Sequence, residues 1–153
     1  MNEENLVTII SIGFLPAFLV IWFFVTYMIG RVSGWFVLQE RFPDRHEDPI
    51  KTLRFQSASI KQEGGKMPAS FGNCLKFDIC STGLRVSLWK IFGLTSKPFF
   101  IPWSQITVTH RSLIWGGLYD FSFGRPFLAT MAIREKTAKV IADNSVLILP
   151  ARD

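Results

Sequence analysis

The sequence has no Asp, Glu, Lys, Arg or His between Leu6 and Gly30. An α-helix over this run would be about 37 Å long, against about 30 Å for the hydrocarbon core of a bilayer. A buried helix of a soluble domain rarely runs this far without a polar face. The missing charges therefore exclude an amphipathic helix and predict a transmembrane helix over residues 6–30, which makes the lipid bilayer a partner of the chain.

Basic side chains are also lacking before this run. A secretory signal peptide needs a positive start, a shorter apolar core and a small-residue cleavage site, and residues 29–33 form a poor one. We therefore expect an uncleaved, single-pass anchor. Because Arg31, Arg41 and Arg45 follow the run, the positive-inside rule predicts residues 1–5 outside the cytoplasm and the C-terminal part inside it.

Cysteine is scarce, with only Cys74 and Cys80 and no CxxC pair. Their even spacing places both thiols on one face of a strand, too far apart to bond to each other. Two unpaired thiols suit a reducing compartment, in agreement with a cytoplasmic C-terminal part. Neither thiol has an activating neighbour in the sequence, so we expect both to be structural.

Catalytic motifs are lacking: there is no HExxH, no GxSxG elbow, no Walker A loop and no GxGxxG. We predict no catalytic, cofactor-binding or metal-ligating residue, no cofactor and no enzyme activity. The alternative is a membrane-bound enzyme whose site follows no motif, using Asp120, His110 or the acidic loop around His46. Trp89 and the other tryptophans could stack on nucleic acid, but aromatic residues at strand spacing are more often core, so no nucleic-acid partner is expected.

Residues 31–50 are predicted to form a juxtamembrane segment and linker. Its first part, residues 34–38, either extends the helix or lies along the membrane interface, with Trp35 at the level of the headgroups. The charged, proline-bounded stretch 43–49 is typical of a loop.

Residues 51–153 are predicted to form a β-rich cytoplasmic domain. Residues 135–142 could be helix or strand, and the prolines at 98 and 102 limit residues 97–103 to a short edge strand. About seven short strands separated by turns indicate a small barrel or sandwich. Alternating apolar residues predict strands at 52–60 (with Leu53 and Phe55 on one face), 75–79, 84–88 and 118–123. Two more strands are expected, at 106–110, which is rich in β-branched residues, and at 127–133.

The charge distribution is one-sided. All 17 Lys and Arg residues follow the apolar run, against 10 of the 12 acidic residues, a net charge of +7. A basic domain held at a membrane is attracted to anionic headgroups, by about 1 kcal/mol per Lys or Arg close to the surface. The basic residues are scattered along the sequence, so ordinary solubility charge explains the balance equally well.

The segments at 73–75, 83–84 and 97–106 resemble small bacterial membrane proteins that pair one N-terminal transmembrane helix with a pleckstrin-homology-like (PH-like) or GRAM-like domain. The most specific element is the stretch Pro98-Phe99-Phe100-Ile101-Pro102-Trp103-Ser104-Gln105-Ile106, and the resemblance covers about residues 30–123. That family has no established activity.

The resemblance implies a PH-like barrel, a place in the cell (inner) membrane, and a binding or scaffolding role toward a protein or anionic lipid headgroups. The loop from Lys61 to Lys66 lies where related lipid-binding domains place headgroup contacts. It lacks their dense Lys/Arg pattern, so phosphoinositide binding is not predicted.

Overall fold

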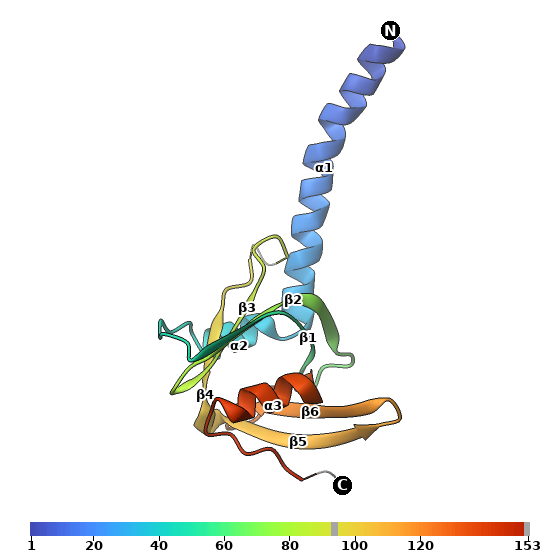
Figure 1. The fold of residues 1–153 in the computed structure, drawn as a ribbon. Helices are drawn as coiled ribbons and strands as arrows, with labels where there is room; N and C mark the ends of the chain where they lie inside the picture. The colour runs from blue at the N-terminus through green and yellow to red at the C-terminus, as the bar shows by residue number, and fades with distance from the viewer. Residues whose placement is uncertain (93–94, 152–153) are drawn as a thin grey trace.

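A computed structural model describes residues 1–92 and 95–151 as a long helix followed by a β-rich domain (Figure 1). The predicted order of an N-terminal apolar helix and a mainly-β domain is confirmed. The elements are α1 (Glu3–Val32), α2 (Trp35–Arg41), β1 (Lys51–Gln62), β2 (Ala69–Ile79), β3 (Gly83–Leu88), β4 (Phe99–Pro102), a 3-10 turn (Trp103–Gln105), β5 (Ile106–Leu113), β6 (Gly116–Phe123), β7 (Ala129–Arg134) and α3 (Glu135–Asp143).

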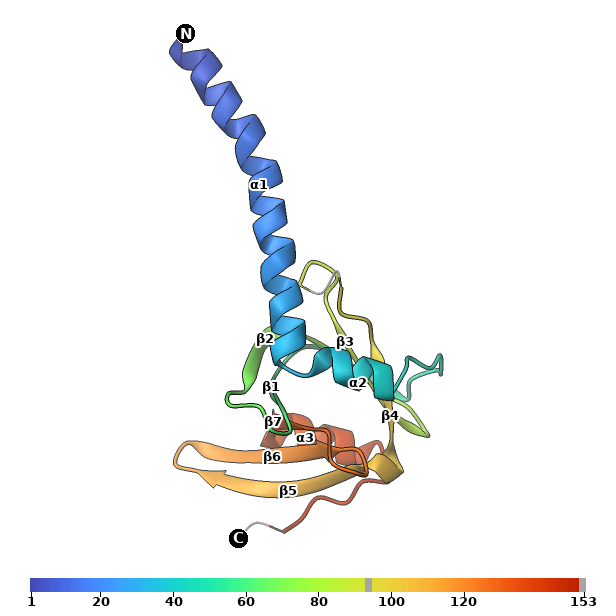
Figure 2. The same ribbon diagram turned by 180° about the vertical axis from the view of Figure 1, so that it is seen from behind.

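Helix α1 projects from the domain (Figure 2). Its apolar side chains are exposed over most of its length. The helix is long and apolar enough to cross a membrane, and no residue of its most apolar stretch is buried against the domain. Thr8 and Ser11 donate their hydroxyl protons to the carbonyl oxygens of Glu4 and Val7, which hides their polarity within the helix. Pro16 lies inside the helix without ending it.

Within the described residues, seven antiparallel strands form one curled sheet in the order β4-β3-β2-β1-β7-β6-β5. The predicted hairpin is β2–β3, in which Leu75 pairs with Leu88 and Ile79 pairs with Leu84. Strand β4 is an edge strand, as the prolines at 98 and 102 predict.

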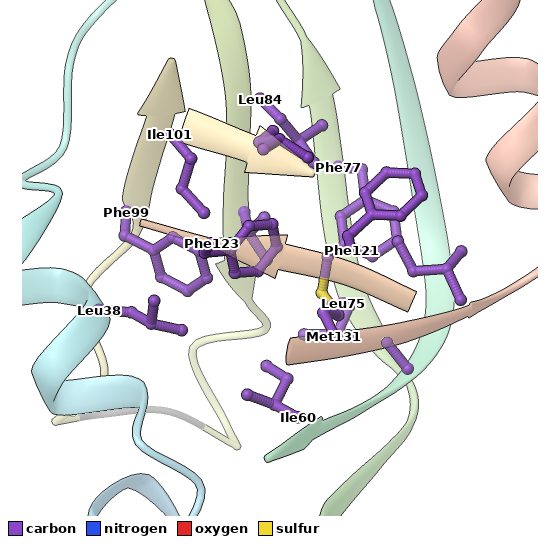
Figure 3. Packing of buried hydrophobic residues seen from close by; sticks show 14 of the residues in the cluster. Leu38, Ile60, Leu75, Phe77, Leu84, Phe99, Ile101, Phe121, Phe123 and Met131 are labelled. Atoms are coloured by element: carbon purple, nitrogen blue, oxygen red, sulfur yellow. The ribbon is translucent and has the colours of Figure 1, made fainter. Parts of the chain in front are cut away.

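The core fills the inside of the curled sheet (Figure 3). Leu75, Phe77, Phe121 and Met131 are fully buried, and they come from β2, β6 and β7. Residues 135–142, for which the sequence allows either helix or strand, are helical. Helix α3 packs against β6 and β7 and buries Ala138 and Ile141, which are three residues apart and so lie on one helical face.

Helix α2 belongs to the same core. Trp35 is fully buried, its indole N–H donates to the carbonyl oxygen of Lys97 at 2.8 Å, and its ring meets Phe99 edge-on at 4.8 Å. Trp35 is therefore not an exposed ring that could anchor the chain among the headgroups. Residues 34–38 do not extend α1, because the turn at Gly34 starts the separate helix α2. A tryptophan directly after an apolar run looks like an interfacial anchor, but here its N–H finds a buried acceptor.

Gly34 makes the turn between α1 and α2. Its φ of +82° is left-handed, and a Cβ there would lie 2.8 Å from Cβ of Gln62. A side chain is therefore excluded by both backbone conformation and space.

The stretch 43–49 is irregular, as predicted, and it is fastened to the domain. Arg85 donates to both carboxylate oxygens of Asp44, at 2.6 and 2.9 Å, and this bond holds the pKa of Asp44 below its ordinary value. Glu47 accepts hydrogen bonds from the hydroxyls of Ser81 and Thr82, which lower its pKa in the same way. The chain between α2 and β1 therefore holds α2 in place.

Strand β1 departs from the predicted pattern at Phe55. The sequence places Phe55 on the same face as Leu53, but Phe55 is 54% exposed and has a φ of +56°. The register of β1 against β2 shifts between Leu53 and Gln56, which marks a bulge. The expected inward position of Phe55 is wrong because a bulge turns the side chain to the other face.

Candidate functional site

The loop between β3 and β4 contacts α1. The indole N–H of Trp22 donates to the carbonyl oxygen of Ile91 at 2.9 Å, and the ring centroids of Trp22 and Phe92 are 5.9 Å apart. In both overall views this loop rises beside the lower part of α1 (Figures 1 and 2). Trp22 precedes Arg31 by about 14 Å along the helix axis. The loop therefore reaches well above the point where α1 joins the domain.

Aromatic rings connect the helix to the sheet through this loop. On α1, Phe18 stacks on Trp22 at 6.0 Å. Phe92 meets Trp89 at 6.4 Å, and Trp89 meets Phe55 edge-on at 5.0 Å. The bulge that exposes Phe55 thus supplies the last ring of the chain. The rings leave considerable apolar surface open, since Ile91 is 62% exposed and Trp89 and Phe92 are also exposed.

The β1–β2 loop lies at the same end of the domain. Gln62, at the end of β1, is in contact distance of Gly34 in the α1–α2 turn. Ala69, at the start of β2, shares a shallow apolar pocket with Phe24 and Val25 of α1. Met67 and Lys66 of this loop are exposed. We call this end of the domain, formed by residues 63–68 and by residues 89–92 and 95–98 around the base of α1, the α1 end.

A cavity of about 690 Å³ lies at the α1 end, between the outer face of β1–β3 and the β3–β4 loop. Lys76 and Arg85 alternate along their strands with the buried residues Phe77 and Val86, so they stand on the face opposite the core. The residues that line the cavity are Arg54, Lys76, Arg85, Ser87, Leu88, Trp89, Lys90, Ile91, Ser96, Lys97 and Pro98.

Two carboxylates, which are not part of the cavity lining, form ion pairs with two of its five basic residues. The buried Asp78 lies 3.7 Å from Nζ of Lys76 and 3.5 Å from a guanidinium nitrogen of Arg85. Asp44 binds Arg85 from the side, and this bond raises the pKa of Arg85 further. Arg85 is therefore a fixed cation within the cavity wall.

The three enzyme candidates from the sequence do not form a site. His110 and Asp120 lie on the paired strands β5 and β6, but His110 pairs with Tyr119, so Asp120 faces the opposite side of the sheet. Asp120 accepts from Arg111 at 3.1 Å, and the cavity that these two line contains neither histidine. His46 is exposed in the loop before β1.

His110 carries one unexplained feature. Its ring stands edge-on to Tyr119 at 4.9 Å, and neither ring nitrogen has a hydrogen-bond partner. Across residues 1–92 and 95–151, no group of three or more His, Cys, Asp or Glu side chains gathers as a metal site would require.

Both cysteines are buried and free, as predicted. Burial raises the pKa of the Cys74 and Cys80 thiols, which keeps them protonated and unreactive.

The cavity was not predicted from the sequence, because its basic residues come from separate segments: β1, β2, β3 and the β3–β4 loop. Trp89 was also interpreted as a core aromatic, whereas it is exposed. The signal that could have identified the loop is the run Trp89-Lys90-Ile91-Phe92, in which apolar residues continue past the end of the alternating pattern. Searches among protein families, curated proteins and solved structures found no match to this chain.

Proposed function

We propose that this protein is a single-pass membrane protein whose β-rich domain is a binding module for the anionic surface of the membrane that anchors it. Helix α1 is the anchor. Residues 1–5 lie outside and the domain lies in the cytoplasm, because the basic residues all follow the apolar run. The resemblance to bacterial membrane proteins supports the inner membrane as the place of the anchor. The observation that carries the proposal is the contact between the β3–β4 loop and Trp22.

The height of that contact supports the proposal. A bilayer of about 40–45 Å with a hydrocarbon core of about 30 Å has a headgroup layer of about 5–8 Å on each side. With Arg31 at the outer edge of this layer, Trp22 lies about 14 Å deeper, which is about 6–9 Å below the boundary with the hydrocarbon. Ile91 and Phe92 lie beside Trp22, so they reach the same depth.

The chemistry of the loop agrees with this depth. Tryptophan favours the membrane interface, and transfer of the exposed Ile91 and Phe92 side chains out of water is favourable. Lys90 stands between Trp89 and Ile91, and its long side chain can extend its ammonium group back to the headgroups.

A PH-like barrel is the fold that we propose for the domain. Helix α3 follows directly after the last strand, which is where PH-like domains carry a capping helix. The curled antiparallel sheet supports the same proposal.

Crosslinking with a phospholipid that carries a photoactivatable group in its acyl chain tests the function. In membranes containing the full chain, we expect lipid adducts on α1 and on residues 89–92, and none on residues 113–115 of the β5–β6 turn. Adducts on α1 alone would contradict the proposal. In a second arm, a photoactivatable amino acid replaces Ile114. A protein adduct at that position, without lipid adducts on the loop, would favour a protein partner instead.

A reporter fused to the C-terminus tests the orientation. We expect cytoplasmic reporter activity, and periplasmic activity would overturn the orientation.

A further inference from the structure

The cavity at the α1 end combines two kinds of wall. The strands provide cationic groups, Arg54, Lys76 and Arg85, on the outer face of the sheet. The loop provides apolar surface through Trp89, Ile91 and Pro98, together with Lys90 and Lys97. No acidic residue is among the described residues that line it.

The charge of the cavity is not neutralised from within the described residues. Asp44 and Asp78 offset two of the five cations, since both bind Arg85 and Asp78 also lies near Lys76. Arg54, Lys90 and Lys97 have no ion pair in the described part of the chain, so three positive charges surround a space of about 690 Å³. Like charges so placed repel one another unless an anion lies between them.

The geometry points to a binding site for the headgroup of an anionic phospholipid, an inference that rests on the proposed function because it needs the α1 end to lie on the bilayer. A phosphate diester would accept hydrogen bonds from the fork of Arg54 and from the ammonium groups of Lys90 and Lys97. The hydroxyl groups of Ser87 and Ser96, which also line the cavity, can donate to its remaining oxygens.

The apolar loop distinguishes a lipid from a soluble phosphate. A phosphate ion needs only the cations, whereas a phospholipid also brings glycerol and acyl chains that require apolar contact. Ile91 lines the cavity and its carbonyl oxygen is bonded to Trp22 of α1. The apolar wall therefore continues from the cavity to the surface of the anchor, along the path that an acyl chain would take.

Native mass spectrometry of the full chain in a non-ionic detergent tests the inference. Phosphatidylglycerol or phosphatidylcholine is added, and the apparent affinity of the first bound lipid is measured. The test variant is Arg54→Gln, Lys90→Gln, Lys97→Gln. The control variant is Lys51→Gln, Lys136→Gln, Lys139→Gln, which removes the same charge from exposed side chains outside this cavity and outside the α1 end.

We expect the natural chain to prefer phosphatidylglycerol over phosphatidylcholine. The test variant should lose at least about tenfold in affinity for phosphatidylglycerol, while the control variant loses less than about threefold. An equal loss in both variants would show a diffuse attraction between net charges and overturn the inference. No loss in the test variant would overturn it as well.

A competition arm separates the two sources of phosphate. Inorganic phosphate is titrated against bound phosphatidylglycerol, and we expect no displacement at equal concentration. Displacement there would assign the cavity to a soluble anion and contradict a lipid site.

The crosslinking experiment above, repeated in purely zwitterionic bilayers, separates this inference from the proposed function. Lipid adducts on residues 89–92 that are stronger in anionic than in zwitterionic bilayers support the proposed function even if the test variant shows that the headgroup site fails. Equal adducts in both bilayers would contradict the preference for an anionic surface. Absence of these adducts from both bilayers removes the proposed function and this inference with it.

Discussion

Two turns of the β domain expose tryptophan and isoleucine, and their surroundings differ. In the β5–β6 turn Ile114 is 94% and Trp115 is 97% exposed, more than any apolar residue described in the β3–β4 loop. Yet of these two turns the β3–β4 loop is the one that contacts α1 and has a cationic cavity beneath it. The β5–β6 hairpin lies away from α1 in both overall views (Figures 1 and 2). Exposure alone therefore does not identify the surface that we propose to meet the membrane; the contact with α1 does.

The difference between the two turns matters only if α1 is firmly joined to the domain. Buried Trp35, the turn at Gly34 and the Asp44–Arg85 pair fix the chain between α1 and β1. If these contacts were loose, the domain could rotate and either turn could reach the bilayer. Three predictions test them, and the first has the largest expected effect.

Replacing Trp35 by Ala should destabilise the domain by about 3–5 kcal/mol, because it leaves a large cavity in the core and leaves the carbonyl oxygen of Lys97 without its donor. Replacing Trp115 by Ala should change stability by less than about 0.5 kcal/mol, since that side chain is almost fully exposed. Chemical denaturation in detergent, followed by circular dichroism of the strands, measures both. Equal effects would mean that α2 is not part of the core.

Replacing Gly34 by Ala should cost about 1–2 kcal/mol for the left-handed backbone, and more because Gln62 must move. Gly64 is the matched control, since its φ is +75° and no neighbouring heavy atom lies within 4 Å of the position that a Cβ would take. Gly64→Ala should therefore cost only the backbone share. A Gly34→Ala variant no less stable than Gly64→Ala, in the same denaturation experiment, would show that the turn is not tightly packed.

Replacing Asp44 by Asn should have the smallest effect, less than about 1 kcal/mol near pH 7, because the pair with Arg85 is partly exposed and screened by solvent. The pKa of Asp44 is lowered in the folded state, mainly by the hydrogen bond from Arg85. The ionised carboxylate therefore stabilises the fold above its ordinary pKa of about 4. This contribution is lost as the pH falls through the lowered folded value.

The difference in unfolding free energy between the natural chain and the Asp44→Asn variant should accordingly shrink in acid. Denaturation of both proteins over a range of pH measures this difference. A difference that stays constant from neutral pH to below the folded pKa of Asp44 would rule out the ion pair as its cause.

Much of the fold follows from local patterns. The apolar run at 6–30 lies within α1, and the hairpin around Ser81–Gly83 and the edge strand at 99–102 follow from alternation and proline positions. Trp35 and Phe55 were misplaced because a buried acceptor and a bulge are properties of tertiary contacts. Neither the acceptor nor the bulge can be predicted from the spacing of apolar and polar residues.

The cavity could not be predicted from the sequence for a related reason. Arg54, Lys76 and Arg85 are scattered in the sequence, and only the pairing of β1, β2 and β3 places them on one outer face. The scattered basic residues looked like ordinary surface charge. The fold gathers five of them around one cavity.

Spin-label accessibility in bilayer nanodiscs tests the central claim most directly. Ile91→Cys and Ile114→Cys each place a label at the exposed tip of an apolar turn, and the buried native thiols stay unlabelled. We predict that the label at residue 91 is more accessible to oxygen, which dissolves in the bilayer, than to a water-soluble nickel chelate, and that the label at residue 114 shows the reverse. Two labels with the same aqueous accessibility would contradict a domain that rests its β3–β4 loop in the membrane.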